Sequence, residues 1–169
     1  MSHAGRVRVA RMQEIDRVAA LWAMITEHHA DLDPLFRMRR GTVAEGELRE
    51  LLRAMARDPD AQILVFDAAA EGVEQSELVG LCIVRVDRAP PILEETERAE
   101  ITDVGVLLAE RRRGVARRLV EEAMDWVRDR GVERVEIQVA SGNSEGQAFW
   151  RSLGYADLMS VLHKRLESR

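Results

Sequence analysis

Hydrophobic and polar residues in the first third of the chain follow two different periods. The alternation from Arg6 to Ala10 predicts a strand. Apolar residues then recur every three or four positions from about Gln13 to His28, which predicts a helix that ends before Pro34, because a proline keeps its predecessor out of the helical region. The segment Thr42 to Glu45 has the sequence of a capping box and predicts the start of a second helix, which ends at Asp58-Pro59.

The middle of the chain changes to strand-like patterns. Two apolar runs, Gln62 to Ala68 and Leu78 to Val86, are joined by a polar turn that contains Gly72, and together they predict an antiparallel hairpin. After an acidic segment the chain is expected to re-enter the sheet at Ile101, and Asp103 to Leu108 is again a run of strand length.

A cluster of arginines separates this strand from an amphipathic helix that begins near Val115. Arg111, Arg112 and Arg113 stand at the helix N-terminus, where unpaired N–H groups already carry roughly half a positive charge. Nothing in the sequence is seen to neutralise these charges. Because Gly114 permits close backbone approach, the junction is suited to bind a phosphate group.

Other interpretations of the basic cluster fit less well. It is not a Walker loop, since no Gly-Lys-Ser/Thr follows, and it lacks the G-x-G-x-x-G spacing of dinucleotide-binding folds. The formal net charge of −5 disfavours a nucleic-acid-binding module held by long-range attraction to phosphate. The arginines are therefore interpreted as a local phosphate-binding device in an acidic protein.

The C-terminal part continues the alternation of elements. Val135 to Val139 predicts a strand, Ser144 to Leu153 a short helix ended by Gly154, and Met159 to His163 a last strand. The element order is then β-α-α-β-β-β-α-β-α-β. The chain has 169 residues, 46% of them hydrophobic, which suits one domain over residues 1–169 with a sizeable core.

Composition adds expectations about the protein's environment. The single cysteine, Cys82, lies in an apolar run, cannot form an internal disulfide and is expected to pack in the sheet. No apolar stretch approaches the ~18 residues of a membrane span and no leader is recognisable, so we expect a cytoplasmic protein without a membrane partner.

Two motifs resemble those of the GNAT superfamily of N-acetyltransferases. Arg111-Arg112-Arg113-Gly114-Val115-Ala116 resembles its R/Q-x-x-G-x-G/A signature, which grips the pyrophosphate of acetyl-coenzyme A between a strand end and a helix N-terminus. Asn143 to Tyr155 looks like the pattern N-x-x-A-x-x-(F/L)-Y-x-x-x-G-F. This segment departs from the pattern at Gly146, where alanine is usual, and at Trp150, where many members place a tyrosine that protonates the departing thiolate.

The resemblance implies an α/β (α+β) acyl-CoA N-acyltransferase fold with a mixed sheet of six to seven strands and about four helices. Its fourth and fifth strands are expected to splay apart, and the pantetheine arm of acetyl-coenzyme A to pair with the backbone of the fourth strand. No metal is implied. The residues that the resemblance assigns to coenzyme binding are Val104, Val106, Arg111, Arg112, Arg113, Gly114, Val115, Ala116, Asn143 and Trp150.

The implied reaction is direct attack of a primary amine on acetyl-coenzyme A in a ternary complex. Asp103 is the first candidate for the base, directly or through water, and Glu100 is the second. The alternative for Asp103 is a salt-bridged or merely exposed strand carboxylate. The acceptor is expected to be a small-molecule amine or a peptide N-terminal amine, and homodimers are common in the family.

Two alternatives stay open at this point. A non-catalytic acyl-coenzyme A sensor would keep the arginine cluster, and the missing tyrosine at Trp150 favours it. A metal site at His28, His29, Asp31 and Asp33 is disfavoured, because the spacing is too short to wrap one ion and a polar loop between helices needs no ligand to explain it.

Overall fold

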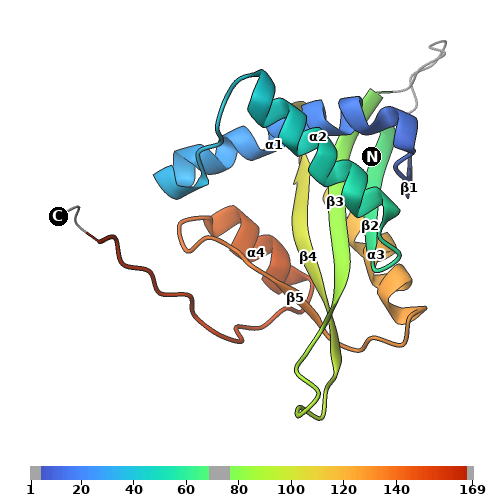
Figure 1. The fold of residues 1–169 in the computed structure, drawn as a ribbon, viewed down its shortest axis with the longest axis vertical. Helices are drawn as coiled ribbons and strands as arrows, with labels where there is room; N and C mark the ends of the chain where they lie inside the picture. Colours follow the sequence, from blue (N-terminus) through green and yellow to red (C-terminus); the bar gives the residue numbers. More distant parts are fainter. Residues whose placement is uncertain (1–4, 69–76, 167–169) are drawn as a thin grey trace. The chain divides into compact units, whose positions relative to one another are not determined.

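The computed structural model describes residues 5–68 and 77–166 and divides the chain into two compact units, Met1–Gln138 and Val139–Arg169. Figure 1 shows the elements of both units. The first unit contains β1 (Gly5–Val9), η1 (Met12–Glu14), α1 (Ile15–Leu32), η2 (Pro34–Phe36), α2 (Thr42–Arg57), β2 (Ala61–Ala68), β3 (Glu77–Arg88), β4 (Glu97–Val106), η3 (Leu108–Glu110), α3 (Val115–Arg128) and β5 (Val135–Ile137). The second contains α4 (Ser144–Ser152).

The first unit is built on a sheet with the strand order β1-β2-β3-β4-β5. The first four strands pair antiparallel with their neighbours, whereas β5 runs parallel to β4. A parallel neighbour needs a crossover connection, which α3 supplies. The predicted fold class is confirmed, as is the element order from the first strand to α4.

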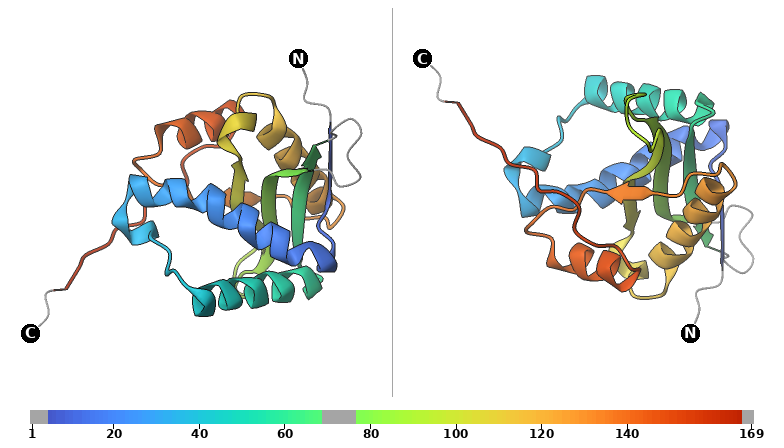
Figure 2. Two further views of the ribbon diagram at one scale, coloured as in Figure 1. Left: turned by 90° about the horizontal axis from the view of Figure 1, so that it is seen from above. Right: turned by 90° about the horizontal axis from the view of Figure 1, so that it is seen from below.

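Helices cover both faces of this sheet (Figure 2), with α1 and α2 on one face and α3 on the other. Alternate residues of a strand point to opposite faces. Ile63, Val65 and Ile83 therefore join the apolar cluster of α1 and α2. The residues that alternate with these along β2 and β3 belong to the opposite face. On that face, a side chain at Gly80 would meet Leu119 and Val115 of α3.

The predicted end of the first helix is wrong, and so is the predicted capping box of the second, although α2 spans Thr42–Arg57 as expected. Helix α1 continues past His28 to Leu32. Nothing interrupts it before Asp33, which is extended at φ −157° and ψ 136° because Pro34 follows. The predicted capping box does not form either. Gly41, at φ 105°, is the N-cap residue of α2 and no side-chain cap bond is made there, since Thr42 is already helical.

The predicted last strand is also wrong. Residues 155–166 carry no helix or strand, so the described residues contain five strands rather than six or seven. The apolar residues of Met159 to His163 are exposed, with Leu162 at 92% and Val161 at 78%. Strand propensity alone does not make a strand, because the backbone needs a hydrogen-bonded neighbour.

Smaller differences concern the strands around the candidate site. Strand β4 begins at Glu97 instead of Ile101 and ends at Val106, since Leu108–Glu110 forms the 3-10 turn η3. Strand β5 ends at Ile137 rather than Val139. The β2–β3 hairpin is confirmed, but the predicted turn at Gly72 lies outside the described residues. None of the described helices has the length and apolar character needed to span a membrane.

Candidate active site

The fourth strand is irregular at Thr102. Asp103 lies opposite Ile83 and Ile101 lies opposite Val84, so Thr102 is an extra residue on β4 without a partner on β3. A bulge of this kind shifts the side chains that follow it by one position. Glu100 and Asp103, three residues apart, consequently share the face of the sheet that carries α1, because their partners Arg85 and Ile83 share it.

The same point ends the pairing between β4 and β5. Their register covers Ala99 with Val135, Glu100 with Glu136 and Ile101 with Ile137, and within the described residues it goes no further. Strand β4 continues to Val106. Strand β4 thus continues beyond its last pair with β5, and the backbone of Val104 and Val106 lies in this continuation, as the expected splaying of the two strands requires.

Asp103 is half-buried and is held by the first helix. The indole Nε1–H of Trp22 on α1 donates a hydrogen bond to Asp103 Oδ1 at 2.9 Å. Gly105, two residues further along the same face, makes this approach of α1 to β4 possible, because a Cβ there would overlap Ile25 Cγ2 and lie 3.2 Å from Ile25 Cβ. Among the described residues the partner of the Asp103 side chain is this neutral indole and not a cation, so Asp103 is not the salt-bridged carboxylate of the alternative interpretation.

Cys82 adjoins Ile83, the β3 partner of Asp103, but its side chain belongs to the opposite face of the sheet, and it is fully buried, as expected. Burial raises the pKa of its thiol, and the negative charge of Asp103 raises that pKa further. The thiol is therefore protonated and inert at neutral pH, and it has no role as a nucleophile.

Glu100 is engaged in an ion pair. Arg85 Nη2 donates to Glu100 Oε2 at 2.8 Å, and Gln138 Nε2 donates to Glu100 Oε1 at 3.3 Å. The hydrogen bond with Glu100 is the largest cause that raises the pKa of Arg85 above its ordinary value. A carboxylate that receives two donors is less suited to accept a proton from an amine than one that receives a single neutral donor.

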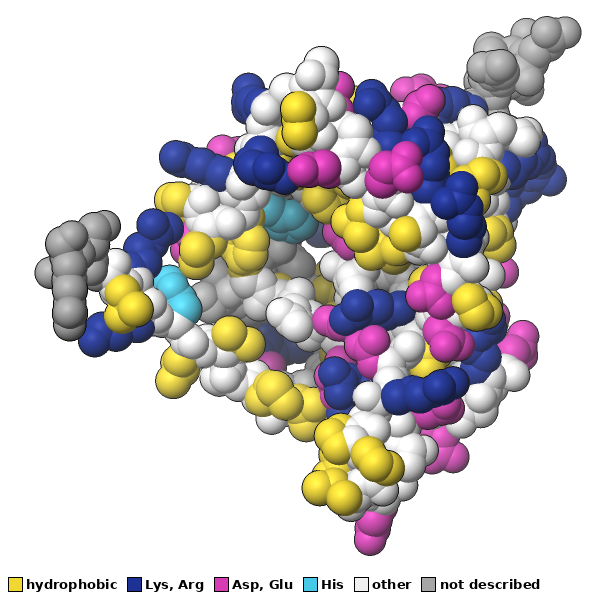
Figure 3. Space-filling model, in the orientation of Figure 1, with side chains coloured by type: hydrophobic (Ala, Val, Ile, Leu, Met, Phe, Trp, Pro, Cys, Tyr) yellow, Lys and Arg dark blue, Asp and Glu magenta, His cyan; other side chains and the backbone are white. Residues whose placement is uncertain are grey.

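Glu100 is part of a larger network of ion pairs on the sheet. Arg85 also contacts Asp87 at 3.2 Å, and Arg98 contacts Glu136 at 3.2 Å. Figure 3 shows Lys/Arg and Asp/Glu side chains intermingled over the first unit. These charges are arranged to neutralise one another, which favours a structural role for Glu100 over a catalytic one.

The predicted phosphate cradle lies at the N-terminus of α3. The N–H of Arg118 donates to the carbonyl of Gly114 at 3.1 Å as the first bond of the helix. The N–H groups of the preceding turn, including those of Val115 and Ala116, therefore have no intrahelical acceptor. Gly114 is left-handed at φ 81°, and a Cβ there would meet nothing within 4 Å. The backbone of this turn is thus accessible to an anion.

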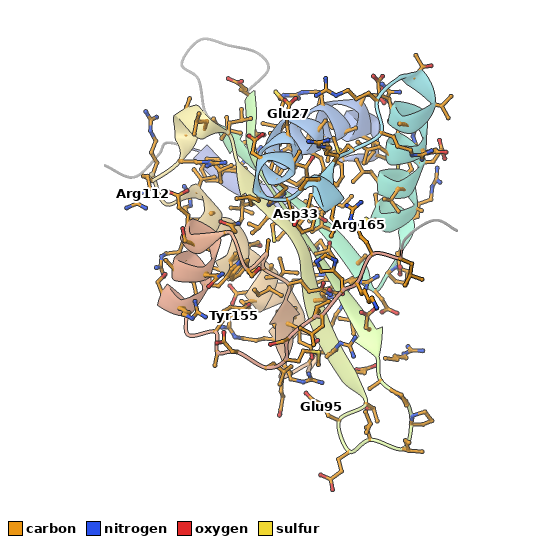
Figure 4. All side chains as sticks on the ribbon, turned by 90° about the vertical axis from the view of Figure 1, so that its left-hand side faces the viewer. Glu27, Asp33, Glu95, Arg112, Tyr155 and Arg165 are labelled. Atoms are coloured by element: carbon orange, nitrogen blue, oxygen red, sulfur yellow. The ribbon has the colours of Figure 1, made fainter. Side chains whose placement is uncertain are left out.

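The arginines of the cluster point in different directions. Arg112 is itself left-handed at φ 65°, is exposed, and points outward in Figure 4. Arg113 pairs with Glu110 at 3.0 Å, and Arg111 Nε donates to the carbonyl of Val106 at 3.4 Å. The sequence therefore did contain a neutralising residue, Glu110. Arg118 lies apart, since it donates to the carbonyl of Gly5 at 2.8 Å.

The remaining predicted residues lie in the second unit, which is described by itself. The Asn143 side chain caps α4 by accepting from the N–H of Gly146 at 2.9 Å. A Cβ at Gly146 would lie 2.6 Å from Asn143 Nδ2, so alanine at this position would require the Asn143 side chain to shift. Trp150 is 6% exposed and packs edge-on against Phe149 and Tyr155, with ring centroids 5.1 and 5.0 Å away.

The loop after α1 has its own structural explanation. Asp33 accepts from the N–H of Leu35 at 2.8 Å and so caps the turn η2, while the ring of His29 lies 6.3 Å from that of Phe36. Among the described residues, no group of three His, Cys, Asp or Glu side chains is placed to hold a metal ion.

Similarity to known proteins agrees with this geometry. The family model described as the acetyltransferase (GNAT) family matches residues 22–155. The chain belongs to this family. None of the curated proteins matches it in sequence.

Solved structures with the GNAT fold cover nearly the whole chain. BH1408 from Bacillus halodurans, as a tetramutant, has a TM-score of 0.78 at 21% identity, and covers 95% of this chain and 99% of its own. A predicted acetyltransferase from Clostridium acetobutylicum with acetyl-CoA gives 0.73 at 12%, with 95% and 96% coverage. An aminoglycoside acetyltransferase from an uncultured soil metagenomic sample, in complex with sisomicin, gives 0.67 at 15%, with 98% and 97% coverage.

The structure thus brings Asp103, Glu100, Val104 and Val106 together on one strand and places the phosphate cradle in the same unit. Sequence analysis missed Trp22 as a site residue. Its position fits the apolar period of α1, and nothing in the sequence reveals that its N–H reaches a carboxylate 81 positions away.

Proposed function

We propose that the protein is an acetyl-coenzyme A-dependent N-acetyltransferase that acetylates a primary amine by direct attack in a ternary complex. The observation that carries the proposal is the course of β4. The strand continues past its last pair with β5 at Ile101, carries Asp103 and leads through η3 to the N-terminus of α3. One segment of the first unit therefore combines a strand edge that pairs with no described strand, a carboxylate and a helix terminus suited to phosphate.

The residues present fit acetyl-coenzyme A. The amides at Val115 and Ala116, together with Arg111 to Arg113, would hold the pyrophosphate, because exposed N–H groups, the helix dipole and cationic side chains all favour an anion there. The pantetheine arm would pair with the backbone of Val104 and Val106 as an added strand does. Structural neighbours that contain CoA or acetyl-CoA support this choice of co-substrate.

The chemistry assigned to Asp103 is proton removal. The acceptor's ammonium loses a proton to Asp103, directly or through water, and its nitrogen forms a bond to the acetyl carbonyl carbon. The carbon–sulfur bond then breaks, the coenzyme leaves as a thiolate, and the surplus proton on the acylated nitrogen passes to that thiolate or to water. Backbone N–H groups of β4 would stabilise the oxygen that gains charge. A thiol has a pKa near ~8.5, so its thiolate leaves without strong acid assistance.

The acceptor class is a small-molecule or peptide-terminal amine. The aminoglycoside acetyltransferases among the structural neighbours support amines of small molecules. Asp103 would interact with the ammonium form of such an acceptor before it removes the proton.

Thermal shift and thiol release test the proposal. Acetyl-coenzyme A at a hundredfold its Kd should stabilise the folded protein by about 2.7 kcal/mol. Gly114→Glu should abolish this shift, because the carboxylate would occupy and repel the pyrophosphate site. Gly41→Glu is a matched control: Gly41 also has positive φ at a helix N-cap with nothing within 4 Å, but it begins α2. If acetyl-coenzyme A stabilised Gly114→Glu as much as Gly41→Glu, the coenzyme would bind elsewhere.

The role of Asp103 has its own test. Free thiol is measured with acetyl-coenzyme A and a panel of amines. Asp103→Asn, whose amide oxygen can still accept from Trp22, should lower kcat/KM about a hundredfold without changing the thermal shift. Glu100→Gln serves as the comparison and should lower it less. A loss below threefold in Asp103→Asn would make Asp103 a structural residue.

An acyl-coenzyme A sensor is the second candidate. It is favoured by Trp150, which is buried and has no acidic proton to give to a thiolate. Binding of acetyl-coenzyme A without thiol release for any amine would support this alternative.

A further inference from the structure

We propose that Trp22 is a positioning residue for the reaction, because its indole N–H fixes the carboxylate of Asp103 in the orientation needed to accept a proton. This inference rests on the proposed function. It concerns a residue of α1 that lies outside both sequence motifs of the family.

The contact has the geometry of a good hydrogen bond. Trp22 Nε1 lies 2.9 Å from Asp103 Oδ1, and both residues are half-buried. In the described part of the chain, this is the hydrogen bond that the structure gives the Asp103 side chain, and it engages Oδ1. Oδ2 is therefore the oxygen left to meet an amine or a bridging water.

The indole is held in place by the packing beneath it. Trp22 stands between Leu21 and Ile25, which are 1% and 8% exposed. Ile25 lies so close to Gly105 on β4 that no side chain would fit between them. Helix α1 and strand β4 therefore have a fixed spacing, and the N–H of Trp22 is directed at Asp103 without further ordering.

An indole is suited to this task because it donates and never accepts. Its N–H does not titrate near neutral pH, so the bond to Asp103 is present whenever the carboxylate is charged.

Four other titratable groups face or adjoin Asp103, and their influence on activity has to be distinguished from that of Trp22. Cys82 and Arg85 are on β3 and Glu100 is on β4, with Arg85 and Glu100 paired to each other. His29 is on α1, seven residues beyond Trp22 and so roughly 10 Å along the helix. Replacing the indole changes none of these groups directly.

The test compares kcat and KM. Trp22→Phe keeps an aromatic ring and removes the donor. Benzothienylalanine at position 22 has the shape of tryptophan with sulfur in place of N–H, so it covers the case in which Trp22→Phe packs badly. Each should lower kcat about tenfold at neutral pH, while the KM for acetyl-coenzyme A should stay within twofold. In an Asp103→Asn background neither change should lower kcat further, which would assign the effect to Asp103.

A second readout does not depend on activity. The fluorescence of Trp22, measured as the difference between proteins with and without Trp22→Phe, should change in Asp103→Ala, which removes the acceptor, and should stay the same in Glu100→Gln.

Three results would overturn the inference: an unchanged kcat in both position-22 variants, a Trp22 fluorescence that is unchanged in Asp103→Ala, or full activity of Asp103→Asn. Failure of the proposed function would look different, since the unchanged protein would then release no thiol with any amine.

Discussion

Replacing Gly105 by alanine tests the spacing between α1 and β4 that places Trp22 against Asp103. The added Cβ would overlap Ile25 Cγ2, and would lie 3.2 Å from Ile25 Cβ and 3.3 Å from Cγ1. Ordinary carbon contacts are ~3.5–4.0 Å. Rotation about χ1 moves Cγ1 and Cγ2 of Ile25 but leaves its Cβ in place, so the backbone of α1 or β4 has to move as well.

The expected cost follows from these contacts. Overpacking costs about 1–3 kcal/mol, and a clash that needs backbone movement belongs at the upper end. Replacing a strand glycine recovers about 0.5–1 kcal/mol of conformational entropy. The net loss is then about 2 kcal/mol, which corresponds to a fall in Tm of about 4–8 °C for a chain of this size.

Urea unfolding followed by circular dichroism measures this loss. Gly46→Ala in α2 is the matched control, because a Cβ at Gly46 meets nothing within 4 Å, and it should stabilise the protein by about 0.5–1 kcal/mol. Ile25→Ala alone should destabilise, but Gly105→Ala combined with Ile25→Ala should cost less than the sum of the two. If Gly105→Ala unfolds at the same urea concentration as the unchanged protein, the close approach of α1 to β4 is refuted.

Three further predictions concern other buried groups. Arg8 bonds both Glu14 and Asp67 at 2.7 Å, and its hydrogen bond to Glu14 is the largest cause that lowers the pKa of Glu14. Glu14→Gln should therefore lower the unfolding free energy by about 3 kcal/mol at neutral pH. This difference in unfolding free energy should shrink as pH falls below the ordinary glutamate pKa, because the native carboxylate is then protonated. An unchanged difference at acidic pH would argue against the ion pair as its source. Cys82 should not react with a disulfide reagent in the native protein and should react after urea unfolding, whereas a fast native reaction would mean that β3 is exposed. Trp150→Phe should keep kcat within a few-fold, while Trp150→Ala should raise the KM for acetyl-coenzyme A and lower Tm. If Trp150→Phe lowered kcat more than a hundredfold with coenzyme binding retained, the indole N–H would have a direct role.

The sequence by itself determined the regular elements whose signals are local. The apolar stripe from Val115 predicted α3 correctly, and the positive φ of Gly114 agrees with the conformational freedom expected there. The arginine cluster and the segment after Asn143 were sufficient to indicate the family that residues 22–155 match. These features depend on neighbours within a few positions along the chain, so a single sequence contains them.

The tertiary structure decided what depends on partners distant in sequence. The prediction of a last strand was wrong because Met159 to His163 has strand propensity but no hydrogen-bonded neighbouring strand among the described residues. The extra residue at Thr102 appears only when β4 is paired with β3, and it puts Glu100 and Asp103 on one face. The two candidate bases then differ by their contacts alone, because Glu100 meets Arg85 whereas Asp103 meets the indole of Trp22. Charge and hydrogen bonding at a carboxylate are set by the residues that packing brings to it, and local sequence does not encode them.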